Sequence, residues 1–503
     1  MKFANIYRII GQAVPICLWA LCILSSTGLC VMLGGCSVGP KYQRPAMPLA
    51  PSYKELGNWQ QAGPKDTIVR DQWWGVFQDA QLNDLEGRVD RGNQTIAAAA
   101  ANYEAARALV REARSQYFPT LTTSPATTYS RVSTIAIPGI TNKGYTDTVY
   151  DLPFTASWEP DLWGRIRKTV QANINAAQGS AADLENARLL MHANLAADYF
   201  DLRGVEQQER LLDATVIAWN KYLDLTRGLL RSGLGADEAV AAAESQLEAA
   251  QAQRTNLGIA HAQYEHAIAI LIGESPSSFS IASSSKDAHL PTVPVGLPAE
   301  LLERRPDIAA AERAMAGANA QIGIAKAAYF PNVLLGATGG LESLSFADWF
   351  TWPSRFWSVG PSVAETVFDA GLRRATVRQY QAQYDETVAN YRQTVLTAFG
   401  QVEDNLAAKR ILVQDLQQQE AAVQSAQRYV KQATTRNLSG LDPYLNVLTA
   451  QVNLLTYQQT YVTFQTQQLL ASVQLIEALG GGWDTGQMPG SKEVSATTAA
   501  HLP

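Results

Sequence analysis

Two long stretches of the chain carry apolar side chains at the spacing of an α-helix. In the first stretch, which has no proline between Asp161 and Ser275, apolar positions follow one another at steps of three and four. These positions are Ile166, Val170, Ile174, Ala177, Ala181 and Leu184. The second stretch repeats the pattern at Val377, Tyr380, Tyr384, Val388, Tyr391 and Val395. Both stretches therefore predict amphipathic helices.

The first predicted helix is too long for a single globular core. Its apolar stripe continues from about Arg165 to Arg231, roughly 67 residues, which would extend about 100 Å at about 1.5 Å per residue. A helix of this length must be paired along its side, as in a coiled coil. The pattern alone also allows a fibrous coiled-coil rod whose polar face is solvated.

Two other regions alternate apolar and polar residues, which is the period of a β-strand. Residues 119–160 and 331–368 each contain two such segments separated by a loop. In the first region the apolar face carries Leu152, Phe154, Ala156 and Trp158. In the second region one face carries Val359, Pro361, Val363, Glu365 and Val367. Each region predicts a hairpin, so the chain should have four strands.

Four strands cannot close a barrel within one chain. An open sheet edge in lipid would leave backbone groups unpaired, so transmembrane strands would require several chains to share one barrel. Their length suits a tilted crossing of the bilayer. Aromatic residues stand where a membrane-interface girdle is expected, at Trp349, Trp352, Phe356 and Trp357. A four-stranded sheet in a soluble domain is the alternative.

The two halves of the chain repeat each other. Residues 113–119 read ARSQYFP and residues 325–331 read AKAAYFP, and Gly233-Leu234 recurs as Gly440-Leu441. We therefore predict two internal repeats, at residues 83–296 and 297–483. An extended, equatorial segment at residues 36–82 precedes them, and a disordered tail at residues 484–503 follows.

The start of the chain resembles a lipoprotein signal peptide over residues 1–35. Lys2 and Arg8 precede a long uncharged apolar run, and the run ends in Leu33-Gly34-Gly35-Cys36. We expect Cys36 to carry a diacylglycerol and, after cleavage, an N-acyl chain such as palmitate. Ser37 in place of an aspartate points to the outer membrane. An uncleaved membrane helix is the alternative.

Composition excludes several classes of function. All four cysteines lie at positions 17, 22, 30 and 36, so the mature chain would have no disulfide and no thiolate metal site. Losing Lys2 and Arg8 with the signal moves the net charge from -6 to -8, and no basic run suggests nucleic acid. The five histidines lack HExxH spacing, and no P-loop or GxSxG motif occurs. We expect no enzyme and no cofactor.

Several motifs, in this order, resemble outer-membrane factors of tripartite efflux systems, the TolC-like channels, in the lipoprotein branch that serves resistance-nodulation-division pumps. Residues 36–42 read CSVGPKY, and Trp73, Trp74 and Phe77 precede the first helix. Residues 301–308 read LLERRPDI, and residues 478–483 read ALGGGW. The resemblance spans about residues 36–483.

The resemblance implies a mainly α fold with a small β part. Three chains would form a homotrimer with a transmembrane barrel of twelve strands, and the long helices would continue it as an α-helical barrel across the periplasm. Partners would be a periplasmic adaptor, an inner-membrane pump and outer-membrane lipid. The pump would supply the energy, and this chain a passive conduit.

Two turns are implied as the tips that contact the adaptor. They contain Gly233 and Leu234 in the first repeat and Gly440 and Leu441 in the second. Independently of the family, glycine tolerates the positive φ that a sharp helix reversal needs, and an exposed leucine offers an apolar contact. Pro443 is predicted at the N1 position of the next helix.

The chain departs from the family near the closed end of the pore. Relatives often have an acidic residue before the alanine of a Leu-Asp-Ala-Gln phrase, whereas this chain has Thr449 there. Candidates for a constriction are therefore Asp442, Leu445 and Thr449. A carboxylate ring would favour cations, and this chain lacks the carboxylate at that level.

We conclude from the sequence that the chain is an outer-membrane exit duct of an efflux pump for drugs or other small toxic compounds. A periplasmic coiled-coil structural lipoprotein and a TolC-like duct for type I protein secretion are the alternatives. The hairpins argue against the structural lipoprotein. The lipobox, which is the sequence Leu33-Gly34-Gly35-Cys36, and the RRPDI phrase at residues 304–308 argue against the secretion duct.

Overall fold

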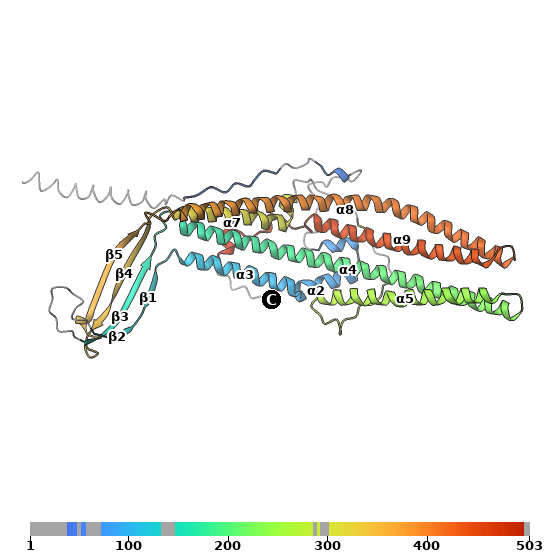
Figure 1. Ribbon diagram of the computed structural model, residues 1–503, viewed down its shortest axis with the longest axis horizontal. Coiled ribbons are helices and arrows are strands. Elements are labelled where there is room, and N and C mark those ends of the chain that lie inside the picture. The colour runs from blue at the N-terminus through green and yellow to red at the C-terminus, as the bar shows by residue number, and fades with distance from the viewer. Residues whose placement is uncertain are drawn as a thin grey trace, which may run out of the picture.

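The computed structural model describes residues 38–47, 52–56, 72–131, 146–284, 289–291 and 301–496. Long helices lie side by side, and a sheet projects from one end of them (Figure 1). The helices are α2 (Ala80–Gly92), α3 (Gln94–Ser115), α4 (Arg165–Arg231), α5 (Asp237–Leu271), α6 (Leu301–Arg304), α7 (Pro306–Ala327), α8 (Leu372–Leu438), α9 (Tyr444–Ala478) and α10 (Ser491–Val494). Short 3₁₀ helices are η1 (Lys54–Leu56), η2 (Trp73–Phe77), η4 (Trp352–Ser354) and η5 (Thr485–Gln487).

Helix α4 covers the range that the apolar stripe predicts, which confirms that prediction. Helices α4 and α8 have 67 residues each, and α5 and α9 have 35 each. Both long helices begin after a glycine in the left-handed region, Gly164 at φ 78° and Gly371 at φ 91°. An aspartate before each glycine, Asp161 or Asp369, accepts hydrogen bonds from amides of the first turn.

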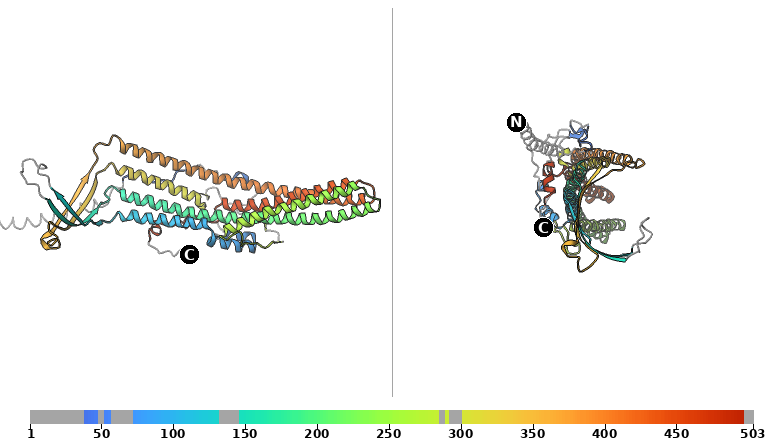
Figure 2. Two further views of the ribbon diagram at one scale, coloured as in Figure 1. Left: turned by 60° about the horizontal axis from the view of Figure 1, so that its bottom comes forward. Right: turned by 90° about the vertical axis from the view of Figure 1, so that its left-hand side faces the viewer.

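The sheet consists of β1 (Thr120–Thr123), β2 (Ala126–Arg131), β3 (Thr146–Trp158), β4 (Asn332–Ser343) and β5 (Arg355–Ala364). All pairs are antiparallel; β1 and β2 both pair with β3, and β4 joins β3 to β5. Seen end on, the sheet curves as an open arc (Figure 2). The described residues therefore fill four strand positions with five strands.

The prediction of four strands was wrong at the first position, where two short strands, β1 and β2, stand in place of one. Ser124 and Pro125 separate β1 from β2, because proline has no N–H to donate to the ladder. The last strand also ends earlier than residue 368. Its final pair is Ala364 with Asn332, and the next residue on the partner strand is Pro331, which cannot continue the pairing.

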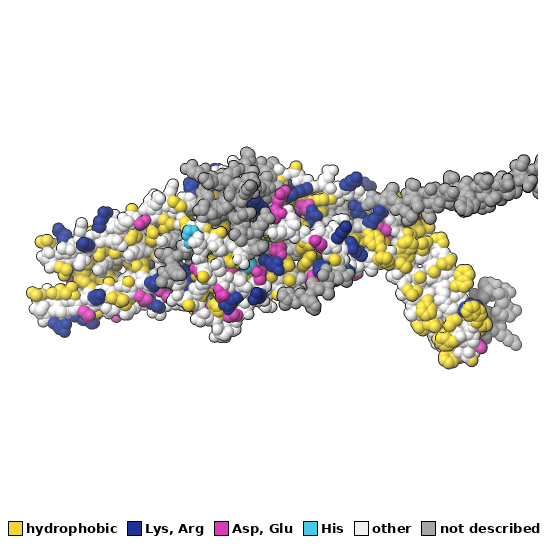
Figure 3. Space-filling model, turned by 180° about the vertical axis from the view of Figure 1, so that it is seen from behind, with side chains coloured by type: hydrophobic (Ala, Val, Ile, Leu, Met, Phe, Trp, Pro, Cys, Tyr) yellow, Lys and Arg dark blue, Asp and Glu magenta, His cyan; other side chains and the backbone are white. Residues whose placement is uncertain are grey.

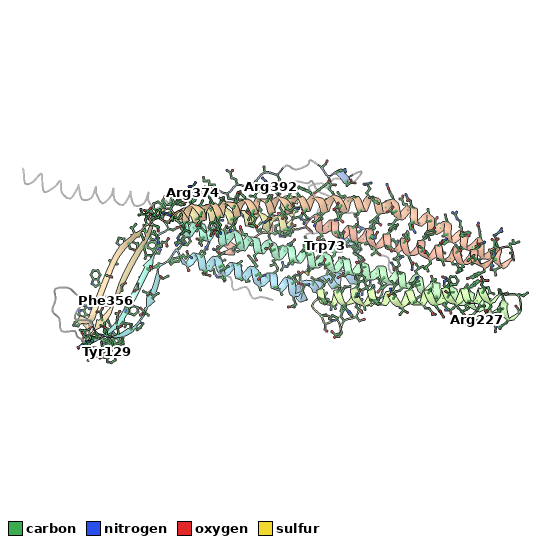
Figure 4. All side chains as sticks on the ribbon, in the orientation of Figure 1. Trp73, Tyr129, Arg227, Phe356, Arg374 and Arg392 are labelled. Carbon is green, nitrogen blue, oxygen red and sulfur yellow. The ribbon has the colours of Figure 1, made fainter. Side chains whose placement is uncertain are left out.

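The main core lies where the segment before α2 crosses the middle of the helices. Trp73, Trp74 and Phe77 are buried there against α4 and α9, and Figure 4 labels Trp73 in this region. The α4 side of this core includes Leu195, Tyr199 and Phe200. Helix α2 is fixed against it by its N-cap, because Asp79 accepts hydrogen bonds from two helix amides and from the Tyr199 hydroxyl.

The prediction of a disordered tail was wrong for residues 484–496, and residues 497–503 lie outside the described residues. Val494 is fully buried in a cluster with Val110 and Ile166. The carbonyls of Pro489 and Ala496 accept hydrogen bonds from Gln178 and Arg107. The segment thus packs on α3 and α4, because one apolar side chain and two carbonyls find partners there.

Replacing Val494 with aspartate should release this segment. A buried carboxylate without a partner costs about 2–4 kcal/mol, and the loss is limited to the free energy with which the segment docks. We expect limited proteolysis to cut within residues 484–496 in the variant, with the products identified by mass spectrometry. Lys492→Ala, on the exposed side of the same turn, is the control. Equal cutting of the two variants would contradict the docking.

No helix in the described part of the chain combines the length and the apolar character needed to cross a bilayer.

Candidate functional site

The two turns farthest from the sheet share one backbone motif. At the end of α4, the Gly233 and Leu234 amides donate to the carbonyls of Leu230 and Leu229. At the end of α8, the amides of Gly440 and Leu441 donate in the same way to residues 437 and 436. This is the Schellman motif, which requires a left-handed residue, and Gly233 and Gly440 have φ values of 71° and 73°.

Each turn presents a leucine to the outside. Leu234 is 80% exposed and Leu441 is 68% exposed. Pro443, predicted at N1, instead occupies the N-cap of α9 with an extended ψ of 148°. The helix begins one residue later because Pro443 follows the reversal directly and still has extended backbone. The turns therefore place one apolar knob each at the same end of the molecule (Figure 1).

Replacing glycine with alanine should change stability in opposite directions at Gly440, just after α8, and at Gly400, inside α8. Gly440→Ala should cost about 1–2 kcal/mol, because only the left-handed φ opposes the methyl group and nothing lies within 4 Å of it. Gly400→Ala, inside α8 and equally open, should stabilise by about 0.5–1 kcal/mol. Thermal unfolding, with hydrogen exchange at the tip amides, measures both. Shifts of the same sign would contradict the strain at Gly440.

Asp442 is held in an ion pair within its own turn. The Arg436 guanidinium donates to both carboxylate oxygens, from Nε at 2.6 Å and from Nη2 at 3.0 Å. Asn437 donates to the Asp442 backbone carbonyl at 3.0 Å. The hydrogen bond from Arg436 lowers the pKa of Asp442, so the carboxylate is charged but largely neutralised by its partner. Sequence reasoning missed this pair.

The other two constriction candidates lie one turn apart on α9. Leu445 is exposed, and the Thr449 hydroxyl donates to the Leu445 carbonyl at 2.8 Å. The hydroxyl is therefore partly satisfied within the helix. Asp442 is half-buried in the turn before α9, and Leu445 and Thr449 are exposed on the first turns of that helix.

A tyrosine pair, which sequence reasoning also missed, connects the two helix hairpins near this end. The rings of Tyr222 on α4 and Tyr444 on α9 stack with centroids 4.0 Å apart and planes at 10°. Burial raises the pKa of Tyr222 to about 12 and that of Tyr444 as well. No short motif marks this pair, since its members lie more than 200 residues apart.

At the opposite end of the molecule, Trp349 and Trp352 of the predicted aromatic girdle lie in the connection between β4 and β5, and Phe356 and Trp357 lie at the start of β5. Trp352 and Trp357 are exposed, and Tyr150 contacts Trp349 with ring centroids 5.5 Å apart. Figure 4 labels Phe356 at this far end of the sheet. A second aromatic group, not predicted, lies where the helices meet the sheet, at Phe118, Tyr329 and Phe330, which are exposed. The repeated YFP phrase was its signal.

One buried cluster is polar. His192 Nδ1 lies 2.6 Å from Glu86 Oε2, its Nε2 lies 3.5 Å from Asp90, and its ring stacks on Trp74 at 4.5 Å. Burial alone would lower the pKa of His192, but hydrogen bonds to Asp90 and Glu86 raise it to about 9. Burial raises the pKa of Glu86. His192 thus lies between α2 and α4.

Cys36 lies outside the described residues. Two positions later, the Val38 amide donates to the Trp163 carbonyl at 3.2 Å, beside the start of α4. The described ranges contain no group of three or more histidine, cysteine, aspartate or glutamate side chains placed to hold a metal ion.

Comparisons with known proteins agree on one family. The profile described as "Outer membrane efflux protein" matches residues 88–274 and 297–481. The toluene efflux pump outer membrane protein TtgF of Pseudomonas putida is 32% identical over 465 residues, covering 91% of this chain and 96% of TtgF. Outer membrane protein OprJ of Pseudomonas aeruginosa is 30% identical over 467 residues, covering 92% and 96%.

Solved structures have the same fold. The outer-membrane channel OprN superposes with a TM-score of 0.83 at 29% identity, covering 89% of this chain and 100% of that one. The CmeC channel of Campylobacter jejuni, at 23% identity, shows the fold alone, with a TM-score of 0.85 over 92% of this chain and 98% of CmeC. The chain belongs to the outer membrane efflux protein family, whose members are outer-membrane efflux channels and not enzymes.

Proposed function

We propose that three copies of this chain form a gated, passive exit duct across the periplasm and the outer membrane. The four strand positions of each copy would supply one third of a transmembrane barrel of twelve strands, and the long helices would continue the conduit. Drugs or other small toxic compounds would leave through it. An inner-membrane pump of the resistance-nodulation-division class would supply the energy.

The open sheet carries this proposal. Every residue of β1 and β2 is exposed, and all but one of the ten residues of β5 are exposed. Within the described residues, neither β5 nor the outer side of β1 and β2 pairs with a further strand. In lipid such edges would leave backbone groups without hydrogen bonds, so closure by neighbouring copies is the arrangement that satisfies them. The space-filling view shows apolar side chains over the sheet (Figure 3).

The helix tips are the proposed contact with a periplasmic adaptor. Gly233 and Gly440 shape the two reversals, and Leu234 and Leu441 stand exposed at their ends. TtgF is described as part of a toluene efflux pump, and a duct of this kind needs a partner at its periplasmic end. An apolar knob at each of six tips in a trimer would suit packing against helices of the adaptor.

Cys36 is the proposed attachment point of a diacylglycerol and an N-acyl chain, after removal of residues 1–35. Support comes from the lipobox and from the course of the following segment. Residue 38 lies beside the start of α4, at the end of the helices nearest the sheet. A lipid on Cys36, two residues before Val38, could therefore reach the membrane that holds the sheet.

Two repeats of one ancestral unit are proposed to build the chain. Equal lengths of α4 and α8 and of α5 and α9, equivalent Schellman turns, and a family profile that matches twice all support this.

The assembly can be tested with protein purified from outer-membrane fractions in detergent. We expect light scattering, corrected for bound detergent, to give three chains per particle, and planar bilayers to show discrete conductance steps. A monomer or dimer that stays soluble without detergent would contradict the duct and favour a periplasmic rod. The same preparation, analysed by mass spectrometry, reports whether Cys36 is acylated.

Thr449→Asp tests the constriction. Three added carboxylates at a narrow level would favour cations, so the permeability ratio of cation to anion should rise about three- to tenfold, read from the reversal potential in a salt gradient. Thr456→Asp, two turns along the same helix, is the matched control and should change the ratio less. Equal shifts would place the narrowest level elsewhere.

A further inference from the structure

The N-terminal strap, residues 38–47, runs along the outside of the helices next to the sheet. Asn319 donates to the Pro40 carbonyl at 3.2 Å, and the Tyr42 hydroxyl donates to Glu312 at 2.6 Å. A Cβ on Gly39 would lie only 2.7 Å from the Cα of Gly323. The strap is therefore closely fixed against the face of α7 that carries Asn319 and Gly323.

Three lysines surround this contact and are here called the strap lysines: Lys41, Lys168 and Lys326. Lys41 belongs to the strap and is exposed. The Lys168 side chain from α4 lies 3.1 Å from the Cβ position of Gly323. Lys326 follows Gly323 by three residues in the same helix, which places both on one face of α7. All three lysines thus belong to segments that meet at the contact between Gly39 and Gly323.

The carboxylates near the start of α4 are already paired with arginines. Arg165 donates to both carboxylate oxygens of Glu159, at 3.0 and 2.8 Å. Arg167 pairs with Asp161 at 3.1 Å. Within the part of the chain that the structure describes, none of the strap lysines has a carboxylate at ion-pair distance. The strap region therefore keeps an excess of positive charge.

This charge adjoins the apolar surface of the sheet. Figure 3 shows basic side chains gathered over the helix ends, directly beside the apolar base of the sheet. Tyr329 and Phe330, exposed at the end of α7, lie three and four residues after Lys326. Arg374, labelled in Figure 4, adds an exposed cation in the first turn of α8. Positive charge, aromatic rings and an apolar face follow one another along the molecule.

We propose that the strap lysines bind phosphate groups of anionic phospholipids in the periplasmic leaflet of the outer membrane. The inference rests on the proposed function, because only a sheet inside the membrane places the helix ends at the level of lipid headgroups. Ammonium groups attract anionic headgroups, and the neighbouring aromatic and apolar surface suits acyl chains. The expected lipid on Cys36 would enter the same leaflet. The lipid would thus fix the strap against α4 and α7.

The test compares two triple variants of the full-length mature protein. Lys41→Gln, Lys168→Gln and Lys326→Gln together remove the strap lysines. The matched control is Lys221→Gln, Arg392→Gln and Lys431→Gln, which removes three exposed cations farther from the sheet. Native mass spectrometry measures binding of dioleoylphosphatidylglycerol and dioleoylphosphatidylcholine to the detergent-solubilised protein. A third variant with arginine at the three strap positions keeps the charge and controls for packing around Lys168.

We expect the wild type, the control and the arginine variant to prefer phosphatidylglycerol. Loss of each lysine should weaken that binding about fivefold. Inorganic phosphate alone should not compete, because it lacks acyl chains. Equal phosphatidylglycerol binding by the wild type and the glutamine variant would overturn the proposal. Conductance in planar bilayers is the separate readout: a conducting channel without the lipid preference refutes the lipid site alone, whereas absence of any channel refutes the duct.

Discussion

Gly480→Ala should remove most of the folded protein from the membrane fraction. Residues 480, 481 and 482 follow α9 with φ values of 91°, 58° and 91°. A Cβ on Gly480 would lie 1.9 Å from the carbonyl oxygen of Arg304, a backbone atom that cannot turn aside. Left-handed strain contributes about 1–2 kcal/mol, and forcing the two backbones apart should raise the total to about 4–5 kcal/mol or more.

The measurement is the yield of folded protein in outer-membrane fractions together with its thermal unfolding midpoint. Gly258→Ala is the matched control, because this glycine lies inside α5 with nothing within 4 Å of its Cβ position. The control should be as stable as the wild type or slightly more stable. Wild-type yield and unfolding midpoint for Gly480→Ala would show that the α9 end can separate from Arg304 without loss.

The same contact explains two of the sequence motifs. Arg305, from the RRPDI phrase, donates from Nη1 to the Ala478 carbonyl at 3.0 Å and to Gln401 at 2.8 Å. Asp307 accepts hydrogen bonds from Nε and Nη2 of the same guanidinium. The ALGGGW phrase thus abuts the RRPDI phrase, and together they join α9, α7 and α8. The resemblance used both phrases as markers, but no spacing in the sequence could show that they meet.

The periodic elements could be predicted because each depends on local pattern. Helix α4 needs only apolar residues at steps of three and four between two prolines, and its observed bounds agree with the stripe. The strands were found for the same reason. Pro125 was visible in the sequence as well, yet its effect depends on the ladder with β3, which the sequence does not display.

The contacts between distant residues could not be predicted. Val494 stands between the polar residues Glu493 and Ser495, and its burial depends on Val110 and Ile166, which are more than 300 residues away. The pairing of Asp442 with Arg436 is different, because the two residues are only six positions apart across a Schellman turn. The Schellman turn brings the two side chains together, so Asp442 is not an unpaired charge near the tip.

The polar cluster between α2 and α4 joins Glu86, Asp90 and His192. His192→Phe should lower the free energy of unfolding by about 3–5 kcal/mol at neutral pH, because it leaves Glu86, which is 0% exposed, without its partner. Adding Glu86→Leu in the same protein should restore most of the loss, since an apolar pair of similar volume needs no compensating charge. Chemical denaturation followed by tryptophan fluorescence measures both.

The pH dependence of the wild type supplies a second, independent readout. His192 has a pKa of about 9 in the folded chain, above its ordinary value of 6.5, so its stabilising effect is complete below pH 6.5 and is lost as pH rises to 9. The pKa of Glu86 is also raised above its ordinary value of 4.5, so its contribution to stability likewise falls as the pH rises, but over a lower pH range. Asp90 and Arg188 also face the cluster and, unlike Glu86 and His192, are both retained in the double variant.

We therefore expect wild-type stability to fall by about 2–3 kcal/mol between pH 6.5 and 9, and the double variant to lose most of this slope. The single variant should lose stability as the pH rises above about 4.5, a lower range than in the wild type, because the buried Glu86 without its partner must stay protonated to remain in the core. If the wild type and the double variant have parallel profiles, the protonated His192 beside Glu86 does not contribute to holding α2 on α4.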